Sequence, residues 1–129
     1  SNLEGLTYRL PTEAEWEKAA AWDPTNNTHY LYGFHRNSID CSWCNYNNCV
    51  GRSTPVGYYD GTGSRNNAKS FYGCYDLSGN VWEWTHNSSY LRGGAWNDNA
   101  ACTTVYRYGL GSWSVRSPYF GFRLVIDPG

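Results

Sequence analysis

The sequence predicts an α+β domain in which one clear helix and several short antiparallel strands are joined by long irregular segments. Helical signals are concentrated between residues 7 and 21, whereas the apolar β-type runs elsewhere are short and bounded by Gly, Asn, Ser and Pro. Residues 23–65 show no steady period and are rich in Asn, Gly and aromatic side chains, with short strand-like pieces predicted at 30–32 and 54–58 between turn signals. With 129 residues, the chain has the length of a single domain with one core.

The helix is predicted from the signals at its N-terminus. Thr12 is a favourable N-cap, and Glu15 three residues later completes a capping box. Glu13, Glu15 and Glu17 fall early in the helix, where its dipole favours negative charge, so we interpret them as capping and solvating groups rather than as catalytic carboxylates. The face expected to be buried holds Trp16, Ala19 and Ala20.

The cysteines leave three interpretations open. The chain has five, an odd number, so at least one is unpaired within it. Thiolates suit tetrahedral zinc, and a four-cysteine site would use Cys41, Cys44, Cys49 and Cys74. Only one Cys-x-x-Cys pair is present, however, so a disulfide or buried free thiols are the alternatives.

Residues 71–85 contain the clearest β-type run. After a Ser-Gly-Asn turn, Val81, Trp82 and Trp84 predict a strand, and Glu83 lies between the two tryptophans. A carboxylate in such an apolar setting needs a partner. That partner is a backbone donor, an arginine such as Arg92 or Arg123, or a calcium ion held by oxygens of Asn80, Val81 and Glu83.

Residues 97–119 are predicted to form displayed surface. The segment is rich in Asn, Ser, Thr, Tyr and Gly, lacks Lys and Glu, and has no helical or strand period. Tyr106, Tyr108, Trp113 and Tyr119 alternate with small polar residues, a composition typical of protein-binding surfaces. The formal net charge of −1 gives no basic footprint for nucleic acid, and no apolar run approaches the length of about 20 residues that spans a membrane. We therefore expect no nucleic-acid partner and no membrane insertion.

Three ordered blocks carry a family resemblance. They are Tyr8-Arg9-Leu10-Pro11-Thr12-Glu13-Ala14-Glu15-Trp16-Glu17, then Tyr75-Asp76-Leu77-Ser78-Gly79-Asn80-Val81-Trp82-Glu83-Trp84, then Arg92-Gly93-Gly94-Ala95-Trp96-Asn97 with the closing Gly121-Phe122-Arg123-Leu124. Together they resemble the sulfatase-modifying, formylglycine-generating enzyme family, which has a C-type lectin-like fold. The resemblance implies one such domain over residues 1–129, matching the C-terminal part of the family's usual domain.

The resemblance also bears on catalysis. The oxidases of this family bind copper through two cysteines that follow the Arg-Gly-Gly block. Here the corresponding positions hold Asp98 and Thr103, and Cys102 lies one residue from the second. A lone thiol cannot supply two-thiolate copper ligation. We therefore expect no catalytic role, with a copper-oxidase relative or fragment as the alternative.

Within this family, the chain most resembles the variable proteins of diversity-generating retroelements. In those proteins a retroelement rewrites adenines in the gene segment for the last part of the fold, here residues 91–125. The resemblance implies a ligand-binding receptor or adhesin, surface-displayed or virion-associated, whose ligand is a protein on a target surface. Gly93, Gly94 and Gly121 would set the backbone path, Trp96 and Phe122 would fill the core, and Arg107 and Arg116 would brace the loops. The positions expected to be exposed for binding are Asp98, Asn99, Ala101, Cys102, Thr104, Tyr108, Gly109, Leu110, Gly111, Trp113, Ser114, Val115, Ser117 and Tyr119.

A third alternative is a calcium-dependent carbohydrate-binding lectin. Sugar-binding C-type lectins carry a Trp-Asn-Asp triplet, which Trp96-Asn97-Asp98 matches. They also carry a Glu-Pro-Asn or Gln-Pro-Asp triplet upstream, and this sequence contains neither. The match is therefore incomplete.

Overall fold

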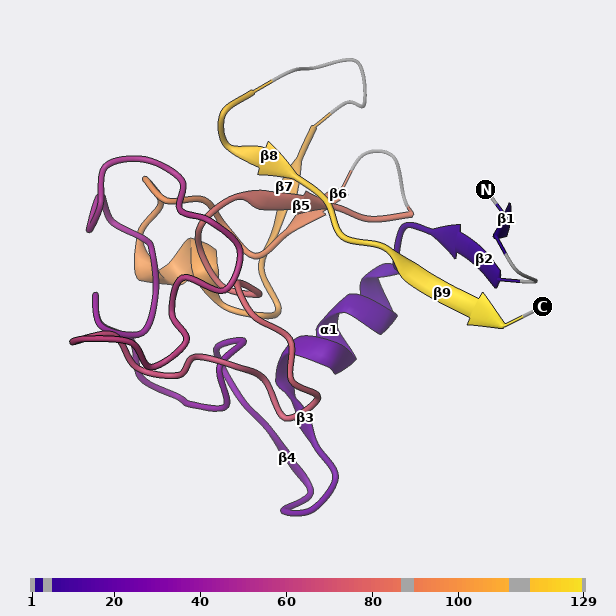
Figure 1. Cartoon of the computed structure of the whole chain (residues 1–129), viewed down its shortest axis with the longest axis horizontal. Coiled ribbons are helices and arrows are strands. Elements are labelled where there is room, and N and C mark those ends of the chain that lie inside the picture. Colours follow the sequence, from indigo (N-terminus) through magenta and orange to yellow (C-terminus); the bar gives the residue numbers. More distant parts are fainter. Residues whose placement is uncertain (1, 4–5, 87–89, 112–116, 129) are drawn as a thin grey trace.

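The computed structural model describes residues 2–3, 6–86, 90–111 and 117–128, and every structural statement below concerns these residues. A single α-helix, α1 (Glu13–Ala21), lies between a mixed four-stranded sheet on one side and a long looped region on the other (Figure 1). The two ends of the chain lie close together at one edge of the molecule (Figure 1). Among the described residues, no helix is long and apolar enough to cross a membrane.

The capping box predicted for α1 is confirmed. The backbone N–H of Glu15 donates to Thr12 Oγ1 at 3.2 Å, and the backbone N–H of Thr12 donates to Glu15 Oε1 at 2.9 Å. Arg9 holds the same carboxylate, with Nη1 2.7 Å from Oε1, and lowers the pKa of Glu15 to about 2. These contacts fix where the helix begins and tie it to the strand before it.

Two small sheets flank α1. Strand β2 (Leu6–Arg9) pairs with β1 (Asn2–Leu3) and with β9 (Val125–Pro128), both antiparallel, with Arg9 opposite Val125. This pairing brings the two ends of the chain into one sheet. Directly after α1, β3 (Trp22–Asp23) and β4 (Thr28–His29) form a short antiparallel hairpin.

The four-stranded sheet carries the segment expected to bind a ligand. Its strand order is β7 (Tyr108–Leu110), β6 (Tyr90–Arg92), β5 (Trp82–Trp84) and β8 (Phe120–Gly121). The β7–β6 and β6–β5 pairs are antiparallel, as predicted, but β5 and β8 are parallel. The β-type run around Trp82 therefore lies in the middle of this sheet, and β7 lies at its edge.

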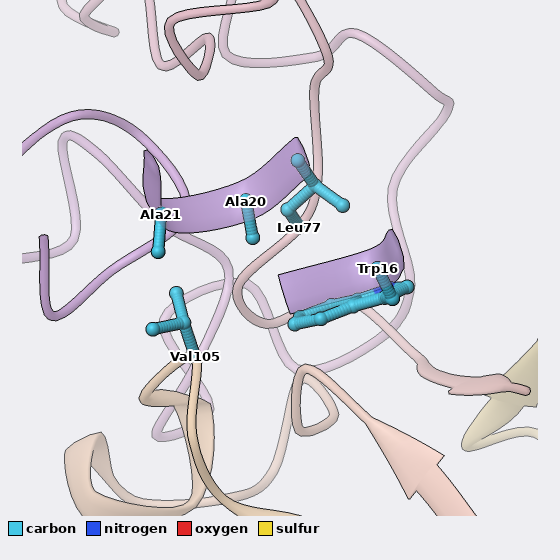
Figure 2. Close-up of a cluster of buried hydrophobic side chains, with 5 residues drawn as sticks. All are labelled: Trp16, Ala20, Ala21, Leu77 and Val105. Carbon is cyan, nitrogen blue, oxygen red and sulfur yellow. The ribbon is translucent and has the colours of Figure 1, made fainter. Parts of the chain in front are cut away.

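Two buried clusters form the core. Figure 2 shows the first, in which side chains of α1 meet two loop residues: Trp16, Ala20, Ala21, Leu77 and Val105, each at most 2% exposed. The second lies in the looped region and consists of Tyr32, Phe34, Cys44, Tyr59 and Ala68. Each cluster joins residues from distant parts of the sequence, so the loops are packed although they lack regular structure.

Three local predictions are wrong. The strand-like pieces at 30–32 and 54–58 are not strands; of these residues, only Tyr32 makes an isolated bridge, with Arg36. Ala19 is half-buried, and Ala21 takes the fully buried place next to Ala20. Phe122, expected in the core, is 66% exposed. In the looped region, aromatic side chains bury their apolar surface in the second cluster, and they do so without forming paired β-strands.

Candidate functional site

The frame of the candidate site is fixed by Arg92 at the end of β6. This side chain is only 8% exposed, and its Nε and Nη1 lie 3.0 Å from Glu13 Oε1 and 2.8 Å from Glu17 Oε1. Its Nη1 also donates to the carbonyl of Val105 at 2.6 Å. Glu13 and Glu17 therefore do more than solvate the helix: they connect α1 to Arg92 of β6, which also binds the segment predicted to be displayed, at Val105.

A second buried ion pair lies under the sheet. Glu83 is 3% exposed; its Oε1 accepts from Trp16 Nε1 at 3.1 Å and from Arg123 Nε at 2.5 Å, and its Oε2 accepts from Arg123 Nη2 at 2.8 Å. Of the alternatives left open for Glu83, the structure shows the arginine. Of the calcium set of Asn80, Val81 and Glu83, the side-chain oxygens of Asn80 and Glu83 accept hydrogen bonds within the protein, and Asn80 Oδ1 accepts from Thr54 N at 2.8 Å. Among the described residues, no three His, Cys, Asp or Glu side chains are grouped to hold a metal.

The Trp96-Asn97-Asp98 triplet serves as a cross-link between loops. Asp98 Oδ2 accepts from Ala95 N at 2.8 Å, and Trp96 N donates to Asn80 O at 2.8 Å. The carbonyls of Trp96 and Asp98 accept from Asn48 N at 2.9 Å and from Asn47 N at 2.7 Å. Asp98 was predicted to be displayed, but its side chain is half-buried and closes a turn.

The short 3-10 helix η1 (Ala100–Thr103) begins the displayed segment. Asn99 is exposed, and its Oδ1 caps η1 by accepting from Cys102 N at 3.1 Å. The expectation that Thr104 is exposed is wrong: it is 3% exposed, and its hydroxyl donates to Ala101 O at 2.9 Å. Of the other predicted positions here, Ala101 is exposed and Cys102 is half-buried.

Among the described residues of the segment, the exposed large hydrophobic side chains lie on and just before β7. Tyr106, Tyr108 and Leu110 are 60%, 52% and 72% exposed, respectively. We call these three residues the display face. Tyr106 was recognised as an exposed-type aromatic residue but was not among the predicted binding positions. Tyr106 lies in a turn before β7, so strand alternation does not apply to it, and the signal that could have found it is an aromatic residue among small polar ones.

The glycines of β7 and the residue after it face the opposite way. A Cβ at Gly109 would lie 3.3 Å from the Trp82 ring, and a Cβ at Gly111 would lie 2.7 Å from Leu91 Cδ1. Both positions were predicted to contact ligand, but the structure uses them to seat β7 on the sheet. Close packing behind β7 therefore fixes the backbone of the display face.

The remaining predicted positions are partly described. Ser117 and Tyr119 are half-buried, and the Tyr119 ring lies 5.2 Å from that of Trp96, which is itself half-buried. Arg107, expected to brace the loops, has an exposed side chain. The positions Trp113, Ser114, Val115 and Arg116 lie outside the described residues.

The cysteines are divided between one disulfide and free thiols. Cys41 and Cys49 are bonded to each other, so in this state two of the four proposed zinc thiolates are absent. Cys44 is 1% exposed, and burial raises the pKa of its thiol. Cys74 and Cys102 are free and half-buried. Of the alternatives predicted for these residues, the structure thus shows both a disulfide and a buried free thiol.

Comparison with known proteins shows that the scaffold is the C-type lectin-like fold of the formylglycine-generating enzyme type, as the sequence predicted. The model of the sulfatase-modifying factor enzyme 1-like domain matches residues 1–128, and the chain belongs to this family. Among solved structures, it resembles Treponema denticola variable protein 1 with a TM-score of 0.71 and 26% identity, over 95% of this chain and 48% of that one. PvdO from Pseudomonas aeruginosa shares the fold at 19% identity, with a TM-score of 0.68 over 91% of this chain and 51% of that one.

Curated relatives overturn the expectation of no catalytic role. A hercynine oxygenase of Mycolicibacterium smegmatis is 39% identical over 84 residues, 65% of this chain and 18% of that protein. A formylglycine-generating enzyme of Thermomonospora curvata is 41% identical over 83 residues, 59% of this chain and 26% of that protein. Both are named as enzymes. Asp98 and Thr103 in place of cysteines exclude two-thiolate copper ligation at these positions and no other chemistry.

Proposed function

We propose that this chain recognises a ligand through the display face of Tyr106, Tyr108 and Leu110. The observation that supports it is their exposure of 60%, 52% and 72% on and beside an edge strand. Large apolar and aromatic side chains grouped on a surface mark interaction sites. The proposal concerns recognition, and an enzyme of this family also needs a surface that holds its substrate.

The rigid frame behind the display face supports the proposal. Strand β7 pairs with β6 over three residues, and Arg92 at the end of β6 is locked to α1. The ring of Tyr108 contacts that of Tyr90, with centroids 5.0 Å apart. A fixed backbone lowers the conformational entropy lost on binding. Exposed side chains on it can also vary without loss of the fold, because surface substitutions change stability little.

We further propose that the ligand is a protein on a target surface and that a retroelement diversifies the display face. Tyrosines among small polar residues give contact area at low entropic cost, as in antibody loops. The structural likeness to a variable protein at 26% identity favours this origin. It also implies a chain that is displayed on a cell or virion surface, where it would meet such a target.

The encoding gene gives a direct test. We expect an imperfect repeat of the segment for residues 91–125 nearby, differing chiefly at adenines. Sequencing of the locus across a population should show changes at codons 101, 106, 108 and 110, while codons 93 and 94 stay constant. Variation spread evenly along the gene, with no such repeat, would reject the retroelement proposal.

Stability measurements test the display face itself. Tyr108→Ser and Leu110→Ser should each change the free energy of unfolding by less than about 1 kcal/mol, because exposed side chains make few contacts. The matched control is Leu91→Ala on the neighbouring strand, where Leu91 is 1% exposed, with an expected loss of about 2–5 kcal/mol. A loss of that size at Tyr108 or Leu110 would show that these residues belong to the core.

A second candidate function is catalytic. The identity of 39% to a hercynine oxygenase over 65% of this chain favours it, and the chain would then form part of a substrate site. Calorimetric titration with hercynine tests this candidate. Saturable binding that is weakened by Tyr108→Ser would favour an oxygenase-type site, and tight uptake of one copper(I) through thiolates would favour a formylglycine-generating type. No binding of either would leave the recognition proposal as the better supported.

A further inference from the structure

A pocket in the looped region has no role in the proposal above. Its volume is about 340 Å³, and it shares no residue with the display face. Three basic and three aromatic side chains contribute to its lining: His35, Arg36, Lys69, Phe34, Trp43 and Phe71. No carboxylate contributes to the lining. The size falls in the range of small-molecule sites, and the lining combines apolar walls with a few charged groups.

Arg36 is positioned as an anion-binding group. Its Cζ lies 4.4 Å from the ring centroid of Trp43, and its Nη2 donates to Ser38 Oγ at 2.8 Å. Within the described part of the chain, its Nη1 has no hydrogen-bond partner, and its buried Nε has none either. The guanidinium is therefore held over an indole ring, with Nη1 left as a donor for a ligand.

The positive charge of the pocket is not neutralised by nearby acids. Among the described residues, no carboxylate lies within 4.0 Å of the charged nitrogens of Arg36 or Lys69, whereas Arg9, Arg92 and Arg123 each have at least one. Hydrogen bonds from the Ser42 hydroxyl and N–H, and to a smaller extent the charge of Arg36, lower the pKa of the Asp40 carboxyl, which forms no ion pair with Arg36. Two cations without acidic partners at one pocket favour an anionic ligand.

His35 shapes the mouth of the pocket rather than adding charge. Its backbone φ is +66°, a conformation that non-glycine residues rarely adopt. The contact that holds it is with buried Asp23, whose Oδ2 lies 2.6 Å from His35 Nε2, and the Tyr30 ring packs edge-on at 4.4 Å. The His35 ring is therefore engaged with Asp23, and the cations of this pocket without a carboxylate partner are Arg36 and Lys69.

The aromatic side chains of the pocket indicate which chemical group the ligand carries besides its negative charge. Phe34, which is 3% exposed, stacks on Trp43 at 5.6 Å with an interplanar angle of 19°, whereas Trp43 is half-buried and Phe71 is 41% exposed. We propose that this pocket binds a small aromatic anion, with its ring against Trp43 and Phe71 and its phosphate or carboxylate on Arg36 and Lys69. Ring stacking and a charge-assisted hydrogen bond would then act together.

Titration with four compounds, followed by amide and indole NMR shifts, tests the proposal. Phenyl phosphate and benzoate carry both features, phenol carries only the ring, and inorganic phosphate carries only the charge. We expect saturable shifts at the Trp43 indole with phenyl phosphate or benzoate, and binding at least about tenfold weaker with phenol and with phosphate. The comparison of phenyl phosphate with benzoate identifies the preferred anion. Equal binding of inorganic phosphate would overturn the aromatic part of the proposal.

Matched variants locate the site. Arg36→Gln and Lys69→Gln should each weaken the preferred aromatic anion by about tenfold. Arg65→Gln is the control, because Arg65 also stacks on an aromatic ring, 4.0 Å from that of Tyr58, but does not line this pocket. Retained spectral dispersion shows that a variant is folded, and exposed Lys69 provides the second test if Arg36→Gln fails to fold. The proposal would be overturned if neither phenyl phosphate nor benzoate bound. It would also be overturned if Arg65→Gln weakened binding of the aromatic anion as much as Arg36→Gln and Lys69→Gln do.

Discussion

At the scale of single residues, the fold depends on buried charges that meet partners far away in the sequence. Glu83 pairs with Arg123, 40 residues away, and Arg92 pairs with Glu13, 79 residues away. A buried charge is stable only when paired and hydrogen-bonded, so each partner is required once the other is present. These pairs give structural roles to four charged residues that lie in the family blocks, Glu13, Glu83, Arg92 and Arg123.

Removing one member of the inner pair should be costly. We expect Glu83→Gln to lower the free energy of unfolding by about 3 kcal/mol, because it leaves the Arg123 charge without a counter-charge. Urea denaturation measures the loss. The control is Asp127→Asn, which removes an exposed partner of Arg9 and should cost less than about 1 kcal/mol. Equal losses in the two variants would contradict the assignment of Glu83 and Arg123 as a buried pair.

In contrast to Glu83, Asp76 should reduce the stability of the folded protein at neutral pH. Burial raises the pKa of its carboxyl above 3.8, although the Gly57 N–H and Arg123 act against the shift. The folded state therefore binds the proton more tightly, and the contribution of Asp76, full below about pH 3.8, is lost as the pH rises through the folded pKa. Asp76→Asn keeps an acceptor for Gly57 and tolerates the backbone φ of +60°. We expect it to raise the melting temperature at pH 7 and to change it little at pH 3.

Asp60 provides the control for Asp76. Hydrogen bonds from the Thr62 hydroxyl and backbone lower the pKa of Asp60, so its contribution to stability is present above about pH 3.8 and is lost as the pH falls through the folded pKa. Asp60→Asn should therefore lower the melting temperature at pH 7. The same sign for both variants at pH 7 would contradict the opposite effects of burial and hydrogen bonding.

At the scale of elements, the turn between Leu77 and Val81 joins the two halves of the fold. Gly79 N donates to Gly93 O at 2.7 Å, and Asn80 N donates to Asn45 O at 2.8 Å. The helix α1 packs on this turn through Trp16 and Leu77 (Figure 2). The turn therefore aligns α1, the four-stranded sheet and the looped region.

Gly79→Ala should disrupt this turn. Its φ is +75°, and an added Cβ would lie 2.4 Å from Asn45 O, a backbone atom that cannot move away cheaply. Gly63→Ala is the matched control, with φ +62° and no atom within 4 Å of the added Cβ. Because the control has only the backbone penalty of about 1 kcal/mol, Gly79→Ala should lower the free energy of unfolding by several times more. Similar losses on chemical denaturation would contradict the steric explanation.

At the scale of the whole molecule, the looped region is held by packing and by the Cys41–Cys49 disulfide. The double variant Cys41→Ser with Cys49→Ser should lower the free energy of unfolding by about 2–3 kcal/mol, because the bond restricts the unfolded chain over a separation of 8 residues. Cys102→Ser is the control, since Cys102 is free. A loss in the double variant no larger than in the control would show that the disulfide adds nothing to stability.

The sequence predicted the helix and the strand around Trp82, because their signals are short-range, but the strand-like pieces at 30–32 and 54–58 do not form strands. The capping box of Thr12 and Glu15 and the β-type run at Trp82 were both placed correctly. The family blocks, including the Arg-Gly-Gly turn, identified the fold. The prediction of no catalytic role was wrong, because missing copper thiolates exclude one kind of metal ligation and not the other activities found in the family.

The tertiary structure decided which side chains face outward. Thr104 is buried and Phe122 is exposed because η1 turns one into the protein and the β8–β9 connection turns the other out. The stacking of Arg36 on Trp43, and the pairing of Glu83 with Arg123, depend on contacts between residues that the chain brings together only on folding. Composition and spacing along the sequence determine where a helix, a turn or a strand can form, whereas the exposure of each side chain depends on what packs against it.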